Sequence, residues 1–471
     1  MKIEQIYTGC LAQGAYYIES NGEVVIIDPL REVQPYIDKA EANGAKIKFI
    51  FETHFHADFV SGHVTLSQKT GAPIIYGPNA NPNFDAITAV DGQEFILGDL
   101  TFVVLHTPGH TMESTTYLLK DKNGRDYALF TGDTLFLGDV GRPDLAQKAA
   151  HMTQEELAAT LYDSLRTKIM PLADEVIVYP AHGAGSACGK NMMKETVDTL
   201  GHQKAVNYAL RADMTKEEFI EEVTDGLLPP PAYFPMNVKM NKEGYENIEE
   251  VLERGQSAFE PNEFEAVANE TGAVILDVRH QSEFAKGHIP GSIFIGIDGD
   301  FAPWVGDLIK DVKQPLLLVA DQVRLEETIT RLSRVGFDNT LGYLKGGFEM
   351  WKQKGKEYDT VTSVPAKEFK QILNDNQDSP IFDVRRTSEF ISEHVVNAES
   401  TPLSSLNDYL AEFPDHETFY VHCAGGYRSM IASSILKSRG IHNFVDIQGG
   451  FKSIKEVGVE TTDYVCPSTL N

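Results

Sequence analysis

The chain has 471 residues, of which 42% are hydrophobic and 23% charged, the composition of a soluble globular protein. This length exceeds what one hydrophobic core usually supports and predicts two to four domains. The formal net charge is −28, and it is spread along the chain. Because nucleic acids and anionic membranes repel such a charge, neither is expected as the main partner.

Two further features bear on the compartment. The N-terminal segment has neither the basic start nor the apolar core of a secretory signal, and no apolar run is long enough to span a bilayer. The four cysteines are scattered and form no CxxC pair: Cys10, Cys188, Cys423 and Cys466. Such free thiols are typical of a reducing environment, so we expect a cytoplasmic protein.

A His-rich turn follows an apolar run that predicts a buried strand. The run at 47–51 (IKFIF) continues into THFHADF, which supplies His54, His56 and Asp58. Loops at strand ends are where a rigid scaffold places metal ligands. A surface loop that is His-rich by chance is the weaker alternative, because related turns follow downstream.

Three later turns each place a His or an Asp at the end of a predicted strand. TPGH ends at His110, TGD ends at Asp133, and YPAH ends at His182. One such turn alone is weak evidence, but strand ends that are distant in sequence can converge. Four turns in this order indicate one metal site, and the helices between the strands predict sheets with helices packed outside.

The four turns together resemble the metallo-β-lactamase superfamily, whose fold is a four-layered αβ/βα sandwich. Most members of that family hold two metals and have a His after the Asp of the first motif. Here that position is Phe59, and a phenyl ring cannot bind a metal. This departure counts against a hydrolase with two zinc ions.

One branch of the superfamily, the persulfide dioxygenases, holds a single iron with two His and one Asp. By this resemblance the ligands of one Fe(II) per chain are His54, His110 and Asp133. Two His and one carboxylate with open positions form the arrangement of non-haem Fe(II) oxygenases.

The other polar residues of the motifs have two interpretations. His56, Asp58 and His182 either fix the orientation of the ligands and of water, or His56 binds the metal directly. A site richer in nitrogen makes zinc more natural, and zinc can also displace iron in a purified sample.

Two residues near these motifs are candidates for substrate chemistry. Arg142, in a GRPD sequence that also resembles the dioxygenases, is expected either to grip a substrate carboxylate or to pair with Asp144. Cys188 lies in a Gly-rich turn that predicts a helix start, which would activate the thiol as a sulfur relay. A small buried residue is an equally weighted interpretation of Cys188.

The second half of the chain contains an internal repeat. The segment 227–235 (LLPPPAYFP) predicts an extended, non-helical linker before it. VILDVR at 274–279 is echoed by PIFDVR at 380–385, and KGGF at 345–348 by QGGF at 448–451. Each repeat alternates strands with amphipathic helices, which predicts a doubly wound α/β fold. Both repeats resemble rhodanese domains.

The repeats differ at the loop that would carry sulfur. In the second repeat the strand FYVH runs into Cys423, two glycines and Arg428, just before a predicted helix. Cys423 and Arg428 are the candidate catalytic residues of this loop. The helix start favours a thiolate, and backbone N–H groups can cradle a persulfide anion. The loop residues expected to form this cradle are Ala424, Gly425, Gly426 and Tyr427. The matching loop at 319–324 (VADQVR) has no sulfur, so we expect the first repeat to be a catalytically silent scaffold or docking module.

The sequence therefore predicts an α/β and α+β multidomain protein. Its parts are a metallo-β-lactamase-like domain with a C-terminal linker at 1–240, a Cys-less rhodanese-like domain at 258–357, and an active rhodanese domain at 364–471. In this order they resemble the persulfide dioxygenase–sulfurtransferase fusions.

That resemblance implies a function in sulfide detoxification. A low-molecular-weight thiol persulfide would be oxidised with O2 at Fe(II) to sulfite, and Cys423 would pass a sulfane sulfur to sulfite to give thiosulfate. The alternatives are a zinc thioester hydrolase of the glyoxalase II kind fused to a sulfurtransferase, and a non-enzymatic sulfur-sensing scaffold. We also expect a homo-oligomer, whose size the sequence does not fix.

Overall fold

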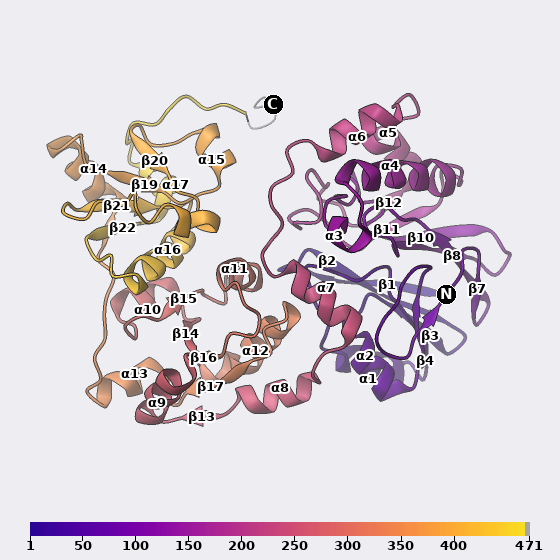
Figure 1. The fold of residues 1–471 in the computed structure, drawn as a ribbon, viewed down its shortest axis with the longest axis horizontal. Helices are drawn as coiled ribbons and strands as arrows, with labels where there is room; N and C mark the ends of the chain where they lie inside the picture. The colour runs from indigo at the N-terminus through magenta and orange to yellow at the C-terminus, as the bar shows by residue number, and fades with distance from the viewer. Residues whose placement is uncertain (467–471) are drawn as a thin grey trace. The chain divides into compact units, whose positions relative to one another are not determined.

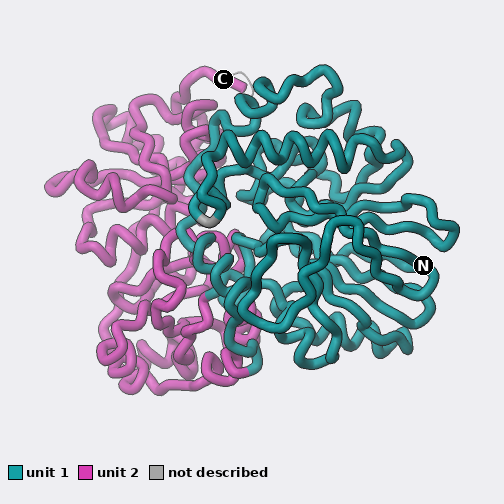
Figure 2. Tube along the Cα trace, turned by 45° about the vertical axis from the view of Figure 1, so that its right-hand side comes forward, with its two compact units in different colours: residues 1–249, 332–336 teal, residues 250–331, 337–471 magenta. Residues whose placement is uncertain are grey.

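The computed structural model describes residues 1–466 and divides them into two compact units (Figure 2). Unit 1 comprises 1–249 together with 332–336, and unit 2 comprises 250–331 and the described residues from 337 onward. Both predicted repeats therefore fall in unit 2, except for 332–336 of the first repeat. No helix of the described chain is long and apolar enough to cross a membrane.

Unit 1 is built on two six-stranded sheets (Figure 1). The first sheet, in spatial order, contains β1 (Lys2–Thr8), β2 (Gln13–Ser20), β3 (Glu23–Ile27), β4 (Lys46–Phe51), β5 (Ile74–Tyr76) and β6 (Ile87–Thr88). The second sheet contains β12 (Asp198–Thr199), β11 (Ile177–Pro180), β10 (Asp126–Gly132), β9 (Thr115–Lys120), β8 (Leu100–His106) and β7 (Glu94–Leu97).

Helices cover the outer faces of the two sheets. The helices of unit 1 are α1 (Gln34–Ala42), α2 (His63–Thr70), α3 (Gln147–Ala150), α4 (Gln154–Ser164), α5 (Leu200–Val206), α6 (Lys216–Thr224) and α7 (Phe234–Glu243); α8 (Ile248–Gly255) follows along the chain. Apolar residues of α1 and α2 pack on the first sheet, and those of α4, α5 and α6 on the second. A third cluster, rich in aromatic rings such as Phe51, Phe102 and Tyr117, fills the space between the sheets. The unit is thus the predicted αβ/βα sandwich.

One edge of this sandwich collects the four sequence motifs. β3, β4 and β5 run parallel, as do β10 and β11, so their carboxyl ends lie together within each sheet. Thr115 N–H at the start of β9 donates to Thr53 O, and Ala181 N–H after β11 donates to Gly132 O. These bonds tie the turns to one another, and this is the physical basis for convergence of strand-end ligands.

Unit 2 contains two five-stranded parallel sheets with the same order of equivalent strands. The first repeat has β13 (Ala258–Phe259), β17 (Thr340–Leu344), β16 (Leu316–Val319), β14 (Val274–Asp277) and β15 (Ile293–Phe294). The second has β18 (Ser363–Pro365), β22 (Phe444–Gln448), β21 (Phe419–His422), β19 (Ile381–Asp383) and β20 (Ala398–Ser400). The central strands β16 and β21 are buried along their whole length, because helices cover both faces of each sheet.

The helices of unit 2 repeat in the same way. The first repeat carries α9 (Pro261–Thr271), α10 (Gln281–Lys286), α11 (Phe301–Leu308), α12 (Leu325–Arg334) and α13 (Gly347–Gln353). The second carries α14 (Ala366–Asp375), α15 (Thr387–Ser392), α16 (Tyr427–Ser438) and α17 (Gly450–Glu456). The doubly wound α/β prediction is therefore confirmed for both repeats.

The predicted linker is wrong at its C-terminal end. Residues 227–231 are not helical, as expected, but Phe234 and Pro235 already form the first turn of α7. A proline is tolerated there because the N–H groups of the first turn have no intrahelical partner.

Candidate metal centre and sulfur-transfer loop

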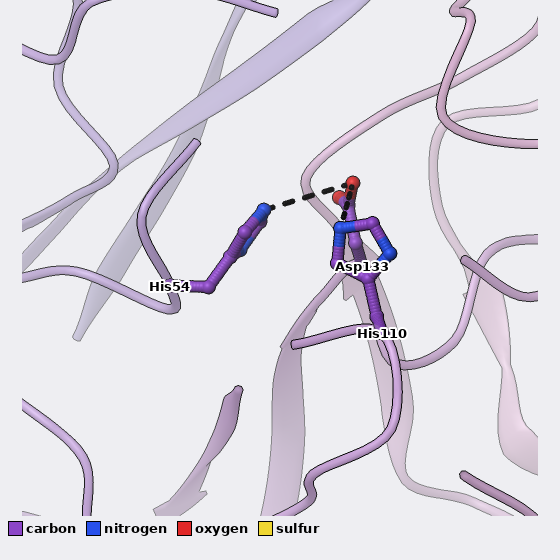
Figure 3. A group of neighbouring side chains, drawn as sticks. All are labelled: His54, His110 and Asp133. Atoms are coloured by element: carbon purple, nitrogen blue, oxygen red, sulfur yellow. Dashed lines mark ion pairs between the residues drawn. The ribbon is translucent and has the colours of Figure 1, made fainter. Parts of the chain in front are cut away.

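The three predicted metal ligands point toward one another (Figure 3). The Nε2 atoms of His54 and His110 lie 3.8 Å and 3.5 Å from Oδ2 of Asp133, and all three side chains are buried. These separations are long for hydrogen bonds, and Asp133 Oδ2 has no hydrogen-bond partner. A buried carboxylate oxygen without a partner is costly, whereas a shared cation at bonding distance would satisfy all three atoms. The residues therefore fit a metal ion.

Neighbouring groups fix which imidazole nitrogen is available. His110 Nδ1 lies 2.9 Å from the carbonyl oxygen of Arg142, which can only accept a hydrogen bond. Thr53 Oγ1 donates to Asp28 Oδ2 and lies 3.0 Å from His54 Nδ1. Both Nδ1 atoms therefore carry the proton, and both Nε2 lone pairs face Asp133.

The charge state of these groups also suits a metal. Burial, followed by the nearby His56, lowers the pKa of His54 well below its ordinary value, so the imidazole is neutral. Burial alone would raise the pKa of Asp133, but His182 and His54 hold it well below its usual range. The neutral imidazole of His54 and the ionised carboxylate of Asp133 bind a divalent cation without first losing a proton.

His182 lies between two carboxylates. Its Nδ1 is 2.7 Å from Asp133 Oδ1, and its Nε2 is 2.8 Å from Asp58 Oδ2. Burial would lower the pKa of His182, but Asp133 and Asp58 raise it well above its ordinary value. The Nδ1 contact fixes the position of the Asp133 carboxylate, and Nε2 faces Asp58 at ion-pair distance. The role of His182 in orienting a metal ligand stays a prediction.

His56, Asp58 and His182 nevertheless form a second group whose donor atoms lie within 4.8 Å of one another. Phe59 is fully buried, and its ring centroid is 4.3 Å from that of His56. The phenyl ring has no donor atom for a metal, whereas a histidine at this position would supply a nitrogen. On the other side, His56 Nε2 is 3.2 Å from Asp28 Oδ1. The second group thus offers two His and one Asp, as the first does, and Phe59 leaves it without a further nitrogen donor.

Further buried polar residues lie close to His56. Glu52 accepts a hydrogen bond from Ser61 Oγ, and its Oε1 is 3.7 Å from Nδ1 of the buried His63. Burial, followed by the charge of Asp28, raises the pKa of Glu52 well above its ordinary value. Burial, followed by His56, lowers the pKa of His63 to about 3.

We predict acid sensitivity from His63. The pKa of His63 is lower in the folded state than in the unfolded state. The neutral side chain therefore makes its full contribution to the free energy of unfolding above pH 6.5, and this contribution is lost as the pH falls toward 3. Between pH 7.5 and pH 5, the metal-free protein is expected to lose about 2 kcal/mol more stability than the His63→Leu variant. Urea unfolding of both proteins at the two pH values measures this difference, and equal losses would contradict it.

Cys188 is close to the metal centre, but it is not activated as predicted. Its sulfur lies within 4.8 Å of donor atoms of Asp133 and His182, and the residue is buried. No helix begins there, since the chain is irregular until β12 and α5. Burial, followed by the charges of Asp58 and Asp133, raises the pKa of the Cys188 thiol well above its ordinary value. The predicted helix start is therefore wrong, and the thiol is protonated.

Arg142 forms the second of its two expected pairs. Its Nε and Nη2 donate to the two carboxylate oxygens of Asp144 at 2.7 Å, and Nη1 donates to the carbonyl of Ala187. The guanidinium also donates to Leu228 O, and the side chain is buried. This geometry gives Arg142 a structural role, and its contact with substrate stays a prediction.

Cys423 lies in the loop between β21 and α16, as predicted. The N–H of Gly426 donates to Sγ at 3.1 Å, and the residue has a φ of 100°, which glycine adopts without strain. Cys423 is buried, and α16 begins at Tyr427 directly after the loop. The sulfur therefore faces a backbone donor at a helix N-terminus.

Two supports of this loop were missed in the sequence. Arg428 donates to both oxygens of Glu389, at 2.6 and 2.9 Å, so its charge is paired. The QGGF motif allows the chain at Gly450 to pack closely against the backbone of Cys423. Any side chain at Gly450 would clash, because its Cβ would lie 2.3 Å from Cys423 O. The repeated SEF and GGF sequences were the available signals for Glu389 and Gly450.

Comparison with known proteins identifies the families of the domains that carry these two sites. Residues 8–182 match the model of the metallo-beta-lactamase superfamily, and 260–354 and 365–457 match the rhodanese-like domain. A crystal structure of a metallo-beta-lactamase from Staphylococcus aureus subsp. aureus COL is 30% identical, with a TM-score of 0.64, and the match covers 73% of this chain and 98% of that one. The chain belongs to the metallo-β-lactamase superfamily. Its metallo-β-lactamase domain is followed by two rhodanese-like domains.

Relatives of the metallo-β-lactamase domain carry two kinds of name. Cytoplasmic hydroxyacylglutathione hydrolase of Arabidopsis thaliana is 33% identical, over 39% of this chain and 67% of that protein. Mitochondrial persulfide dioxygenase ETHE1 of Homo sapiens is 28% identical, over 46% of this chain and 78% of that protein. The family and the fusion with rhodanese-like domains match the sequence-based expectation. The names of the relatives do not decide between hydrolysis and oxidation, so the reaction is inferred from the site.

Proposed function

We propose that the chain oxidises a low-molecular-weight thiol persulfide with O2 to sulfite and then forms thiosulfate by sulfur transfer through Cys423. The observation that carries the oxidation step is the partnerless Oδ2 of Asp133, which faces Nε2 of His54 and His110. Two His and one carboxylate are the donor set of non-haem Fe(II) oxygenases. The metal, when bound, would bring the persulfide sulfur and O2 together and supply the redox chemistry.

The protein's own residues hold this donor set in place. His182 keeps Asp133 oriented through Oδ1, and Thr53 and the Arg142 carbonyl fix the two imidazole tautomers. The oxidation balances as persulfide, O2 and water giving thiol, sulfite and two protons. The buried Cys188 thiol lies near the same atoms, and a role for it as a sulfur relay would require a neighbour that removes its proton.

The transfer step belongs to the second rhodanese-like domain. The Cys423 thiolate attacks the outer sulfur of a second persulfide, whose S–S bond breaks as the thiol leaves. Sulfite then takes that sulfur from Cys423, which gives thiosulfate and restores the thiolate. The Gly426 N–H stabilises sulfur anions at Sγ, and the start of α16 adds positive potential. One chain carrying both sites raises the local concentration of sulfite.

Phe59 offers a test of the metal assignment. The Phe59→His substitution is expected to raise bound metal from one to two ions per chain, because it adds a nitrogen to the group of His56, Asp58 and His182. The matched control, Phe59→Leu, should stay at one ion. Metal analysis of proteins loaded anaerobically with Fe(II) measures this. Two ions per chain in the unsubstituted protein, with hydrolysis of thioesters, would instead support the zinc hydrolase.

A further inference from the structure

Cys423 opens into a cavity that the Cys-less domain helps to form. The cavity has a volume of about 380 Å³, the size of a small-molecule site. Its lining from the second rhodanese-like domain consists of the Cys423 loop with Arg386 and Glu389. The first domain adds Asp300, the N-cap of α11, and Trp304 from the helix itself. The domain without a cysteine is therefore part of the transfer site.

Close contacts hold this part of the first domain against the active loop. The Tyr427 hydroxyl donates to Gly296 O at 2.7 Å, and a Cβ on Gly299 would approach the Tyr427 ring to 2.3 Å. In addition, Phe294 N–H donates to Ser434 Oγ on α16. These contacts hold the segment 294–299, which leads into Asp300, against Tyr427 at the start of α16.

The charges around the cavity are of both signs. Glu389 and Arg428 pair through two hydrogen bonds and largely neutralise each other. The exposed Asp300 and Arg386 add a carboxylate and a guanidinium to the same cavity, and Arg386 also interacts with the charge of Asp307. Trp304 is 9% exposed and supplies an apolar wall. A ligand that matches this lining has an ammonium group, a carboxylate and a short carbon skeleton.

We propose that Asp300 and Trp304 of the Cys-less domain select the sulfur donor, and that the donor is the persulfide of an amino-acid-like thiol. This rests on the proposed function of Cys423 as the sulfur acceptor. The ammonium group of the donor donates to the Asp300 carboxylate, and its carboxylate pairs with Arg386. Trp304 covers the carbon skeleton and excludes water. The donor S–S bond is then presented to Sγ of Cys423, and the departing thiol keeps the proton.

Thiosulfate formation from added sulfite under anaerobic conditions isolates the transfer step from the oxidation step. Two donors are compared: cysteine persulfide, which has an ammonium group, and N-acetylcysteine persulfide, which lacks one. Asp300→Asn is expected to lower kcat/KM about tenfold for cysteine persulfide and less than twofold for the acetylated donor. Asp300→Glu should restore much of the loss, and Glu326→Gln, an exposed charge change in the same domain, should have no effect.

The outcomes separate the two levels of the proposal. An equal loss with both donors, or no loss with either, would overturn the assignment of Asp300 to an ammonium group. Trp304→Ala is expected to raise KM for both donors. An unchanged KM would contradict the role of Trp304 in binding the donor. Transfer at the unsubstituted rate by a Cys423→Ser variant would overturn the underlying function itself, whatever Asp300 does.

Discussion

The Asp133→Asn variant is expected to lose persulfide-dependent O2 uptake by at least about 100-fold, together with its bound iron. The substitution removes the negative charge that faces two imidazoles and replaces one carboxylate oxygen by an amide nitrogen. An amide N–H₂ cannot bind a cation, and His182 loses an ionic partner. Removal of an outer-shell group alone costs 10–100-fold, so loss of a ligand should cost more.

Asp126→Asn is the matched control, because Asp126 begins the same strand β10 and is exposed. It should keep both iron and O2 uptake. Anaerobic sulfur transfer from a persulfide to sulfite should survive in both variants, since Cys423 lies on a separate domain. If Asp133→Asn kept stoichiometric iron and O2 uptake within tenfold, Asp133 would not be a ligand.

The Cys423→Ser variant should lose thiosulfate formation almost completely and release sulfite instead. A hydroxyl oxygen cannot carry a sulfane sulfur under these conditions, and no second cysteine lies in the loop. O2 uptake should remain near that of the unsubstituted protein, because the metal centre is untouched. Ion chromatography of sulfite and thiosulfate, recorded beside an oxygen electrode, measures both.

The exposed Cys466 provides the control for this substitution. Cys466→Ser removes a thiol of the same chemical class and should change neither product nor rate. An unchanged ratio of thiosulfate to sulfite in Cys423→Ser would show that sulfur reaches sulfite by another route.

The convergence of the three candidate metal ligands could be predicted because their positions depend on strand ends. The turns that end at His54, His110 and Asp133 each follow an apolar strand, and such strands form the sheets seen here. Phe59 was informative for the same reason, since a single position in a fixed turn decides whether a nitrogen is available. Local pattern and ligand chemistry were sufficient at these positions.

Other features depend on contacts between distant residues, which one sequence does not reveal. The pairing of Arg428 with Glu389 and the placement of Asp300 beside Cys423 follow from tertiary packing. The Gly-rich turn at Cys188 has the composition of a helix start, but the chain there remains irregular and buries the thiol. Burial, rather than a helix dipole, therefore sets its protonation state.

The central claim is that one iron at His54, His110 and Asp133 oxidises persulfide sulfur. Its most direct test is O2 uptake by protein reconstituted anaerobically with one Fe(II) per chain and then given glutathione persulfide. We predict one O2 consumed for each persulfide oxidised, with loss of activity when zinc replaces iron. No O2 uptake by the iron-loaded protein, with thioester hydrolysis by the zinc-loaded protein, would contradict the account.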